Sequence, residues 1–206
     1  KSAFARWSQV PARTGLTGAA IARRVCEMGG ATEVDVEISE GYLSDHYDPV
    51  NRVLRLSRDN YHGNSVAAAA IAAHEAGHAI QHAVKYPFLA LRSAYVPLAS
   101  IGSWLSFPLL FAGAFFSIGP LITAGIALFG AVVIFQIITL PVEFDASARA
   151  KRLLADSGLI QDPEEMRGVK SVLGAAALTY VAATIQAVLT LLYYLWRLGI
   201  LGGNRN

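Results

Sequence analysis

The amino-acid sequence predicts a mainly α membrane protein with three transmembrane helices and a small α+β head that carries a short β-sheet. Of the 206 residues, 54% are hydrophobic and only 16% are charged, which is more apolar than a typical soluble domain. Residues 95–116, 121–140 and 172–196 contain no charged side chain, and about twenty apolar residues are enough for a helix to cross a bilayer. Buried helices of a soluble protein are the alternative, which three such stretches in so short a chain disfavour.

The head is predicted to occupy residues 1–93 and to contain helical and extended segments. Residues 17–28 show the apolar spacing of a helix that ends before two glycines. Residues 34–38 and Val53–Ser57 alternate between apolar and polar side chains, as half-buried strands do. These two strands predict a small sheet.

The remainder of the chain is predicted to form three further parts. Residues 94–140 form a transmembrane hairpin, because only the short sequence SIGP at residues 117–120 separates its two apolar stretches. Residues 141–171 form another helix and a connecting loop. Residues 172–206 form a C-terminal transmembrane helix and a tail.

The pentapeptide His74-Glu75-Ala76-Gly77-His78 lies in an apolar stretch that is predicted to be helical. Histidines four residues apart lie on one face of a helix, so both imidazoles can reach one metal ion. A hydrolytic zinc site needs a third protein ligand, an open position for water and a base that takes the proton of that water. We therefore predict that His74 and His78 bind Zn²⁺ and that Glu75 is the catalytic base. A coincidental spacing of two ordinary helix histidines is the alternative.

The third metal ligand has two candidates. His82 lies one turn beyond His78 on the same predicted helix, where it would point along the helix axis, so we interpret it as a residue that supports the site or as a half-exposed helix histidine. Glu143 follows the second apolar stretch and is predicted to lie on another helix. A carboxylate is a suitable zinc ligand, although a charged residue at the membrane boundary is an alternative. We predict that Glu143 is the ligand.

Five sequence segments together resemble the YugP-like family of membrane-bound neutral zinc metallopeptidases, of the gluzincin type. The segments are residues 15–18 (GLTG), 45–49 (DHYDP), 73–82 (AHEAGHAIQH), 139–147 (TLPVEFDAS) and 175–182 (AAALTYVA). The resemblance spans nearly the whole chain. It implies a membrane zinc peptidase with a zincin-like head, in which His74, His78 and Glu143 bind zinc and Glu75 is catalytic.

The resemblance also carries two expectations that this chain departs from. Members usually begin with an additional transmembrane helix, whereas this chain starts at Lys1-Ser2-Ala3 without a methionine. A processed precursor, an organellar import product and a trimmed chain are the alternatives for this start. Related membrane gluzincins often place an aspartate four residues after the ligand glutamate, where it supports a histidine. This chain has Ser147 at that position, so a hydroxyl would take the place of the carboxylate.

Other residues are candidates for parts of the catalytic machinery. Tyr180 and Arg149 are candidate donors to the oxyanion that develops on the scissile carbonyl, and an interfacial tyrosine and an anchoring cation are the respective alternatives. An edge strand next to the metal helix would pair with an extended substrate, and we assign that role to Val53, Leu54, Arg55, Leu56 and Ser57. His46 and Asp48 lie in an Asp- and Pro-containing segment that favours a structural turn; contact with the catalytic centre is the alternative.

The charge distribution predicts the orientation in the membrane. Residues 1–93 contain ten Lys and Arg, residues 141–171 contain five, and two lie beyond the last apolar stretch. Because basic residues concentrate on the cytoplasmic side, the metal site is expected there, or on the matrix or stromal side in an organelle. The single cysteine, Cys26, allows no intramolecular disulfide. Basic residues at membrane flanks suit lipid headgroups, and nothing indicates a nucleic-acid partner.

The sequence thus predicts a membrane-integrated zinc endopeptidase that hydrolyses polypeptides at the membrane interface through a zinc-activated water and Glu75. A structural subunit of a larger membrane complex, with an idle metal site, is the alternative from another functional class. An intramembrane protease of the site-2 type ranks last, because it would need an aspartate within a membrane span and none of the three apolar stretches contains one.

Overall fold

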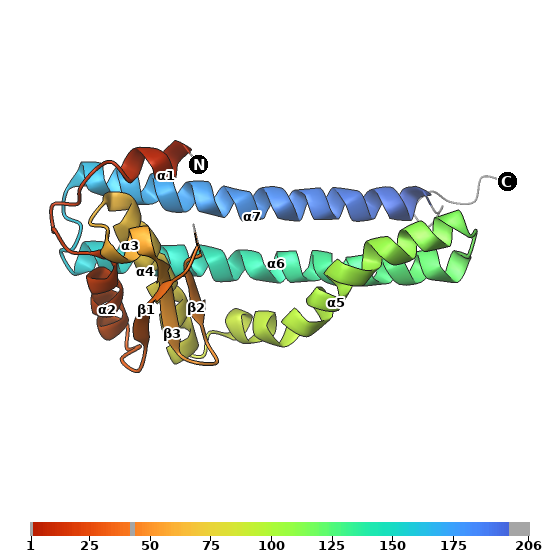
Figure 1. Cartoon of the computed structure of the whole chain (residues 1–206), viewed down its shortest axis with the longest axis horizontal. Coiled ribbons are helices and arrows are strands. Elements are labelled where there is room, and N and C mark those ends of the chain that lie inside the picture. The colour runs from red at the N-terminus through yellow and green to blue at the C-terminus, as the bar shows by residue number, and fades with distance from the viewer. Residues whose placement is uncertain (1, 42–43, 198–206) are drawn as a thin grey trace. The chain divides into compact units, whose positions relative to one another are not determined.

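The computed structural model describes residues 2–41 and 44–197 (Figure 1). The elements of this part of the chain are α1 (Ser2–Trp7), α2 (Gly18–Met28), β1 (Asp35–Ser39), β2 (His46–Asp48), β3 (Val53–Ser57), α3 (Arg58–His62), α4 (Val66–Ala83), α5 (Pro87–Phe115), α6 (Gly119–Asp156) and α7 (Pro163–Arg197). Three of the helices, α5 to α7, are long and apolar enough to cross a membrane, and the sheet has three strands. The predicted fold class is therefore confirmed.

The chain divides into two compact units. The first unit contains Lys1–Leu89 and Val142–Leu178, and the second contains residues 90–141 and the chain from Thr179 onward. Both long helices α6 and α7 contribute to each unit. The candidate functional residues of the head and of the segment after Pro141 all belong to the first unit.

Helix α4 lies at the centre of the first unit, in contact with α1, α2, α3, β2 and β3. Its first turn is capped by Ser65, whose hydroxyl accepts a hydrogen bond from the Ala68 N–H at 3.1 Å. Eight of its 18 residues are buried alanines, whose small side chains let neighbouring elements approach closely. Ile21 of α2 and Leu54 of β3 are fully buried in the same core. Cys26 of α2 is buried there too, and burial raises the pKa of its thiol to about 12, so reaction of this thiol reports opening of the core.

The sheet has the strand order β1-β3-β2, with β3 parallel to β1 and antiparallel to β2. The prediction that Val53–Ser57 is an edge strand is therefore wrong, because β3 is the central strand of the described sheet. The sequence analysis missed β2, which is only three residues long and lies in a segment that composition marks as a turn. Within this sheet, an added peptide strand could pair only with an edge formed by β1 or β2.

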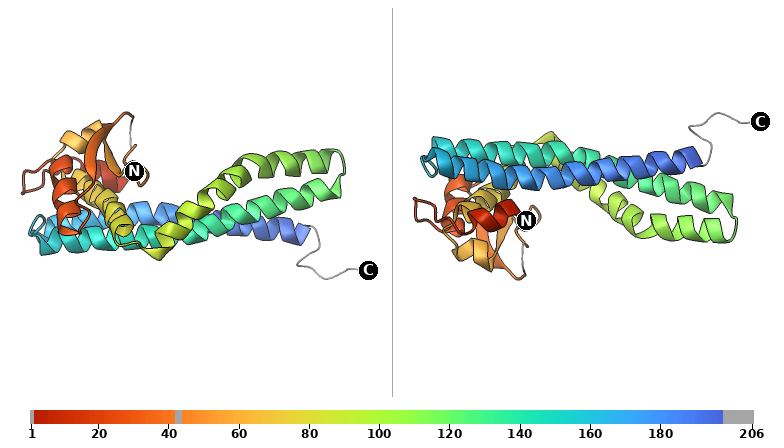
Figure 2. Two further views of the ribbon diagram at one scale, coloured as in Figure 1. Left: turned by 90° about the horizontal axis from the view of Figure 1, so that it is seen from below. Right: turned by 90° about the horizontal axis from the view of Figure 1, so that it is seen from above.

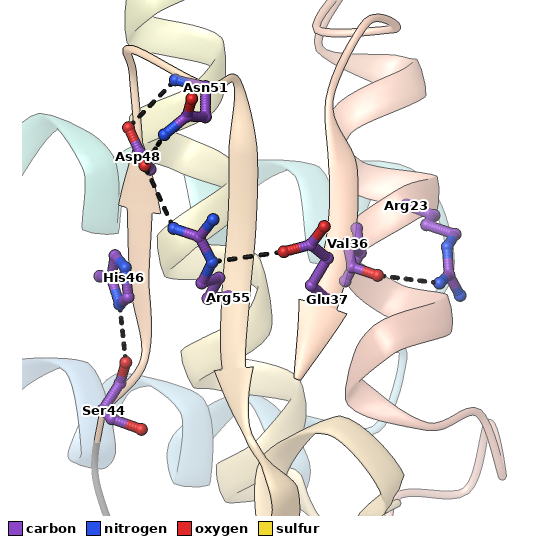
Figure 3. Close-up of polar contacts among 8 residues, drawn as sticks. All are labelled: Arg23, Val36, Glu37, Ser44, His46, Asp48, Asn51 and Arg55. Atoms are coloured by element: carbon purple, nitrogen blue, oxygen red, sulfur yellow. Dashed lines mark hydrogen bonds and ion pairs between the residues drawn. The ribbon is translucent and has the colours of Figure 1, made fainter. Parts of the chain in front are cut away.

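A charged side chain in the middle of β3 connects all three strands (Figure 3). Arg55 contacts Glu37 of β1 at 3.3 Å and Asp48 of β2 at 3.1 Å. Asp48 also accepts hydrogen bonds from the side-chain amide of Asn51 and from the backbone N–H groups of Asn51 and Val50. The bond from the Asn51 side chain is the largest influence, and together with the backbone bonds and the arginine it holds the pKa of Asp48 well below the usual range. These contacts are those of the structural turn that the sequence favours at this position.

Helices α5 and α6 run beside each other as an antiparallel hairpin in the second unit (Figure 2). Close packing of this pair depends on glycine: a Cβ atom on Gly102 would lie 2.6 Å from the carbonyl oxygen of Leu128, and one on Gly125 would lie 2.8 Å from that of Ser106. Small residues that allow such backbone approach are typical of helix pairs in membranes. The turn that joins the two helices lies between Phe115 and Gly119; that this pair crosses the membrane stays a prediction.

Helix α6 is longer than the sequence indicates. The sequence predicts a boundary between residues 140 and 141, with Glu143 on a separate helix, but α6 is continuous through Pro141 as far as Asp156. Proline removes one backbone hydrogen bond from a helix interior, a loss that long membrane helices tolerate where their neighbours compensate. The second apolar stretch of the hairpin and the candidate ligand Glu143 therefore lie on one helix, α6.

Candidate metal centre

The first two candidate ligands lie on α4, as their spacing predicts. The imidazole rings of His74 and His78 have centroids 4.8 Å apart and meet edge to face. Their side chains are 13% and 11% exposed, so each ring is mostly enclosed yet still reachable from solvent. One turn of helix therefore presents two nitrogen ligands to the same small space.

The third candidate ligand, Glu143, is brought to this space by α6. Its Oε2 atom lies 3.2 Å from Nε2 of His74 and 3.7 Å from Nε2 of His78. The candidate ligand atoms of the three residues all lie within 4.8 Å of one another. Two atoms bound to the same zinc ion are about 3.3 Å apart, because the bonds are about 2.0–2.1 Å long and tetrahedral. The two measured separations are close to this value, so the residues fit a zinc ion.

A glycine within the pentapeptide sets the distance between the two ligand-bearing helices. A Cβ atom on Gly77 would lie 2.6 Å from the carbonyl oxygen of Ala146 and 3.1 Å from its Cα. Real side chains do not approach a backbone oxygen so closely, and a backbone cannot move aside as a flexible side chain can. Gly77 therefore permits the close approach of α4 and α6 that places Glu143 beside the histidines.

We expect Gly77→Ala to lower zinc affinity by at least about tenfold and to destabilise the first unit. Alanine in place of glycine favours a helix by about 1 kcal/mol when space is free, but forcing a methyl group against a packed backbone costs about 1–3 kcal/mol. The steric cost of the methyl group should exceed the helix preference of alanine at this position. Chelator competition and thermal unfolding measure the two quantities.

Gly174→Ala is the matched control, because a Cβ atom on Gly174 of α7 would meet nothing within 4 Å. It should leave zinc affinity unchanged and raise stability slightly. Parent-like zinc affinity in the Gly77 variant would show that the helix contact does not determine the site.

Both histidines are held by further side chains at the nitrogen that faces away from Glu143. The Ser147 hydroxyl lies 3.1 Å from Nδ1 of His74, which matches the supporting position that sequence analysis gave to a hydroxyl. Gln81 contacts the second histidine, with its Oε1 atom 3.0 Å from Nδ1 of His78. Such contacts at the distal nitrogen orient histidines that bind metals.

The site around His78 is strongly negative. Burial, the largest influence, lowers the pKa of His78, but the hydrogen bond to Glu143 and the charges of Glu75 and Glu143 outweigh it, so the pKa is raised above its ordinary value. The surroundings that favour a proton on this ring also favour a divalent cation beside it.

Glu75 is a mostly buried carboxylate next to the ligand pair. The residue is 9% exposed, and its negative charge acts on His78. Among the described residues its side chain makes no hydrogen bond or ion pair, whereas Glu143 contacts both histidines. Its carboxylate is thus available to accept a proton.

The remaining predicted site residues have different positions. Nδ1 of His82 lies 2.8 Å from the Tyr47 hydroxyl, so His82 connects α4 to β2 and is not in the ligand group. Arg149 donates through Nε to Asp145 at 2.6 Å. Tyr180 lies on α7 in the second unit, and its catalytic role stays a prediction.

Two further residues lie at the site that were not among the predicted site residues, Gln81 and Asp145. Gln81 is completely buried, and its Nε2 donates to Asp145 at 2.8 Å. The available signal was the spacing: Gln81 follows His78 by three residues and Asp145 follows Glu143 by two, so each polar side chain lies close to a predicted ligand in the sequence.

Comparison with known proteins agrees with this geometry. The sequence model of a family described as "Putative neutral zinc metallopeptidase" matches residues 1–199. The "Putative membrane protease YugP" of Bacillus subtilis (strain 168) is 48% identical over 196 residues, which cover 94% of this chain and 86% of that protein. No solved structure matches this chain. On the strength of these matches over nearly its full length, the chain belongs to this family of neutral zinc metallopeptidases.

Proposed function

We propose that this protein is a membrane-integrated zinc-dependent endopeptidase in which His74, His78 and Glu143 bind the metal and Glu75 is the general base. The observation that carries the proposal is the convergence of two imidazole nitrogens and one carboxylate oxygen within 4.8 Å. Three protein ligands leave a fourth position open, which is the arrangement of catalytic and not of structural zinc sites. The family name and the name of the Bacillus relative support the same activity.

The residues of the site divide the work of hydrolysis among them. A bound zinc ion would supply Lewis acidity that polarises a carbonyl and acidifies water. His74, His78 and Glu143 hold the cation, and the carboxylate offsets part of its charge. Glu75 accepts the proton of the attacking water and delivers it to the leaving amine, a role that suits a carboxylate with no hydrogen-bond partner among the described residues.

The proposed substrate is a polypeptide, which the names of the family and of the Bacillus relative support. Helix α6 carries both an apolar stretch long enough to cross a membrane and Glu143, which supports a location of the proposed chemistry near the membrane interface. The excess of Lys and Arg on the segments that carry the ligands supports a site on the cytoplasmic side.

The first test is metal content together with metal-dependent hydrolysis. Protein purified in detergent without chelator should contain about one zinc per chain. It should cleave members of a quenched-fluorescent peptide library, lose that activity on chelation and regain it when zinc is returned. Absence of zinc from protein whose Cys26 thiol remains protected would refute the proposed metal site, since the core would be intact.

A further inference from the structure

We propose that Gln81 is a positioning residue that locks His78 in the one neutral tautomer able to bind the metal, and that Asp145 holds Gln81 in place. This inference rests on the proposed zinc site. It explains why, in the neutral His78 ring, the lone pair that would bind the metal is already on the nitrogen that faces the metal position.

The orientation of the Gln81 amide follows from its partners. The side chain is completely buried, and its Nε2 donates to the Val142 carbonyl and to the Asp145 carboxylate, both at 2.8 Å. Neither of these groups has a hydrogen to donate. An inverted amide would place its oxygen against two acceptors, so the nitrogen faces α6 and Oε1 faces His78.

The protonation of His78 follows from the orientation of that amide. Oε1 of Gln81 lies 3.0 Å from Nδ1 of His78 and can only accept a hydrogen bond. Nδ1 must therefore carry the hydrogen, and in the neutral ring the lone pair lies on Nε2. Nε2 is the atom 3.7 Å from Glu143, so the free lone pair faces the metal position.

Asp145 is itself fixed by a neighbour on the same helix. The Oδ2 atom that accepts from Gln81 also accepts from Nε of Arg149 at 2.6 Å. The guanidinium of Arg149 lies 5.8 Å from the centre of the Tyr86 ring, a cation–π distance. This chain of contacts gives Arg149 a supporting place in the site, in addition to its candidate role as an oxyanion donor.

The Nδ1 atom of His74 has a different kind of partner. It is 3.1 Å from the Ser147 hydroxyl, which can donate or accept a hydrogen bond. The hydroxyl therefore orients His74 without choosing its tautomer. Among the described residues, the difference between the two histidines is thus at Nδ1: the partner of His78 can only accept a hydrogen bond, whereas that of His74 can do either.

Zinc affinity tests the role of Gln81. Gln81→Met keeps the length of the side chain and removes the amide, and it should weaken zinc binding about 10- to 100-fold, the usual effect of losing a partner of a ligand. Asn60→Ala is the control: Asn60 is another buried polar residue of the first unit, which donates to Asp45 at 2.9 Å, and its loss should change zinc affinity less than about threefold. Equal affinity in Gln81→Met and the parent would overturn the proposal.

A second pair of variants tests Asp145 and remains informative if Gln81→Met does not fold. Asp145→Asn can place an oxygen where Oδ2 accepts from both Gln81 and Arg149, so it should retain most of the affinity. Asp145→Leu removes that acceptor and should lose about tenfold or more. Equal affinities in the two variants would refute the role of Asp145.

The tautomer can be observed directly without metal. In zinc-free protein with ring-¹⁵N histidine, above the pKa of His78, the parent should show His78 with hydrogen on Nδ1, and Gln81→Met should show a mixture. The His78 signal is identified by its loss in His78→Gln. Hydrogen on Nε2 in the parent would overturn the inference even if zinc binds, whereas a parent that binds no zinc but has hydrogen on Nδ1 would refute only the proposed function.

Discussion

Glu75→Gln is expected to lower peptide hydrolysis about 10²- to 10⁴-fold while leaving about one zinc bound per chain. Glutamine matches the shape of glutamate but cannot take a proton from water, so the variant removes proton transfer and little else. Glu75 is outside the ligand group, which is why metal binding should survive. Zinc content and the rate of peptide cleavage, measured on the same preparation, check both parts.

Two comparisons make the result of Glu75→Gln specific. Glu27→Gln removes a charge from an exposed glutamate of α2 and should retain parent activity. Glu75→Asp keeps the carboxylate but withdraws it by one methylene, so its activity should fall between those of the parent and Glu75→Gln. Parent-like activity in Glu75→Gln would exclude Glu75 as the base, and loss of zinc along with activity would show that Glu75 acts through the metal site.

The proximity of the two candidate ligand histidines and the long apolar helices could be predicted because local patterns determine them. His74 and His78 are four residues apart on a helix, so their proximity follows from helix geometry alone. The long uncharged stretches specify helices because lipid leaves few other ways to satisfy a backbone. The prediction of Glu143 required one further step, namely that a transmembrane hairpin returns the chain to the side of the membrane on which it began.

The strand order of the sheet and the residues that support the candidate ligands could not be predicted from local patterns. The three residues of β2 are too few to show an alternating pattern. Without β2, the sequence predicts β3 as an edge strand, whereas β3 is the central strand. Gln81 in a helical sequence resembles any polar residue of an apolar helix. Its importance arises only when α6 places the Val142 carbonyl and Asp145 beside it, a contact between residues more than sixty positions apart.

Glu143→Ala is expected to reduce zinc affinity by more than the roughly 100-fold that loss of a ligand's partner can cost. The substitution leaves His74 and His78 as a pair of neutral ligands, without the third ligand atom and without one of the two carboxylates whose charges act on His78. Chelator competition on detergent-purified protein measures the effect. Glu164→Ala removes an exposed glutamate of α7 that pairs with Arg167, and it should bind zinc as the parent does.

Glu143→Gln separates the charge of this residue from its shape. The amide keeps an oxygen near both histidines but is a weaker ligand than a carboxylate, so its zinc affinity should lie between those of the parent and Glu143→Ala. Parent affinity in Glu143→Ala would remove Glu143 from the ligand set, and the nearness of its carboxylate to the histidines would then be only an ion pair. If Glu143→Ala instead loses zinc while Glu75→Gln keeps it and loses hydrolysis, holding the metal and moving the proton belong to different carboxylates, and an idle metal site cannot account for both results.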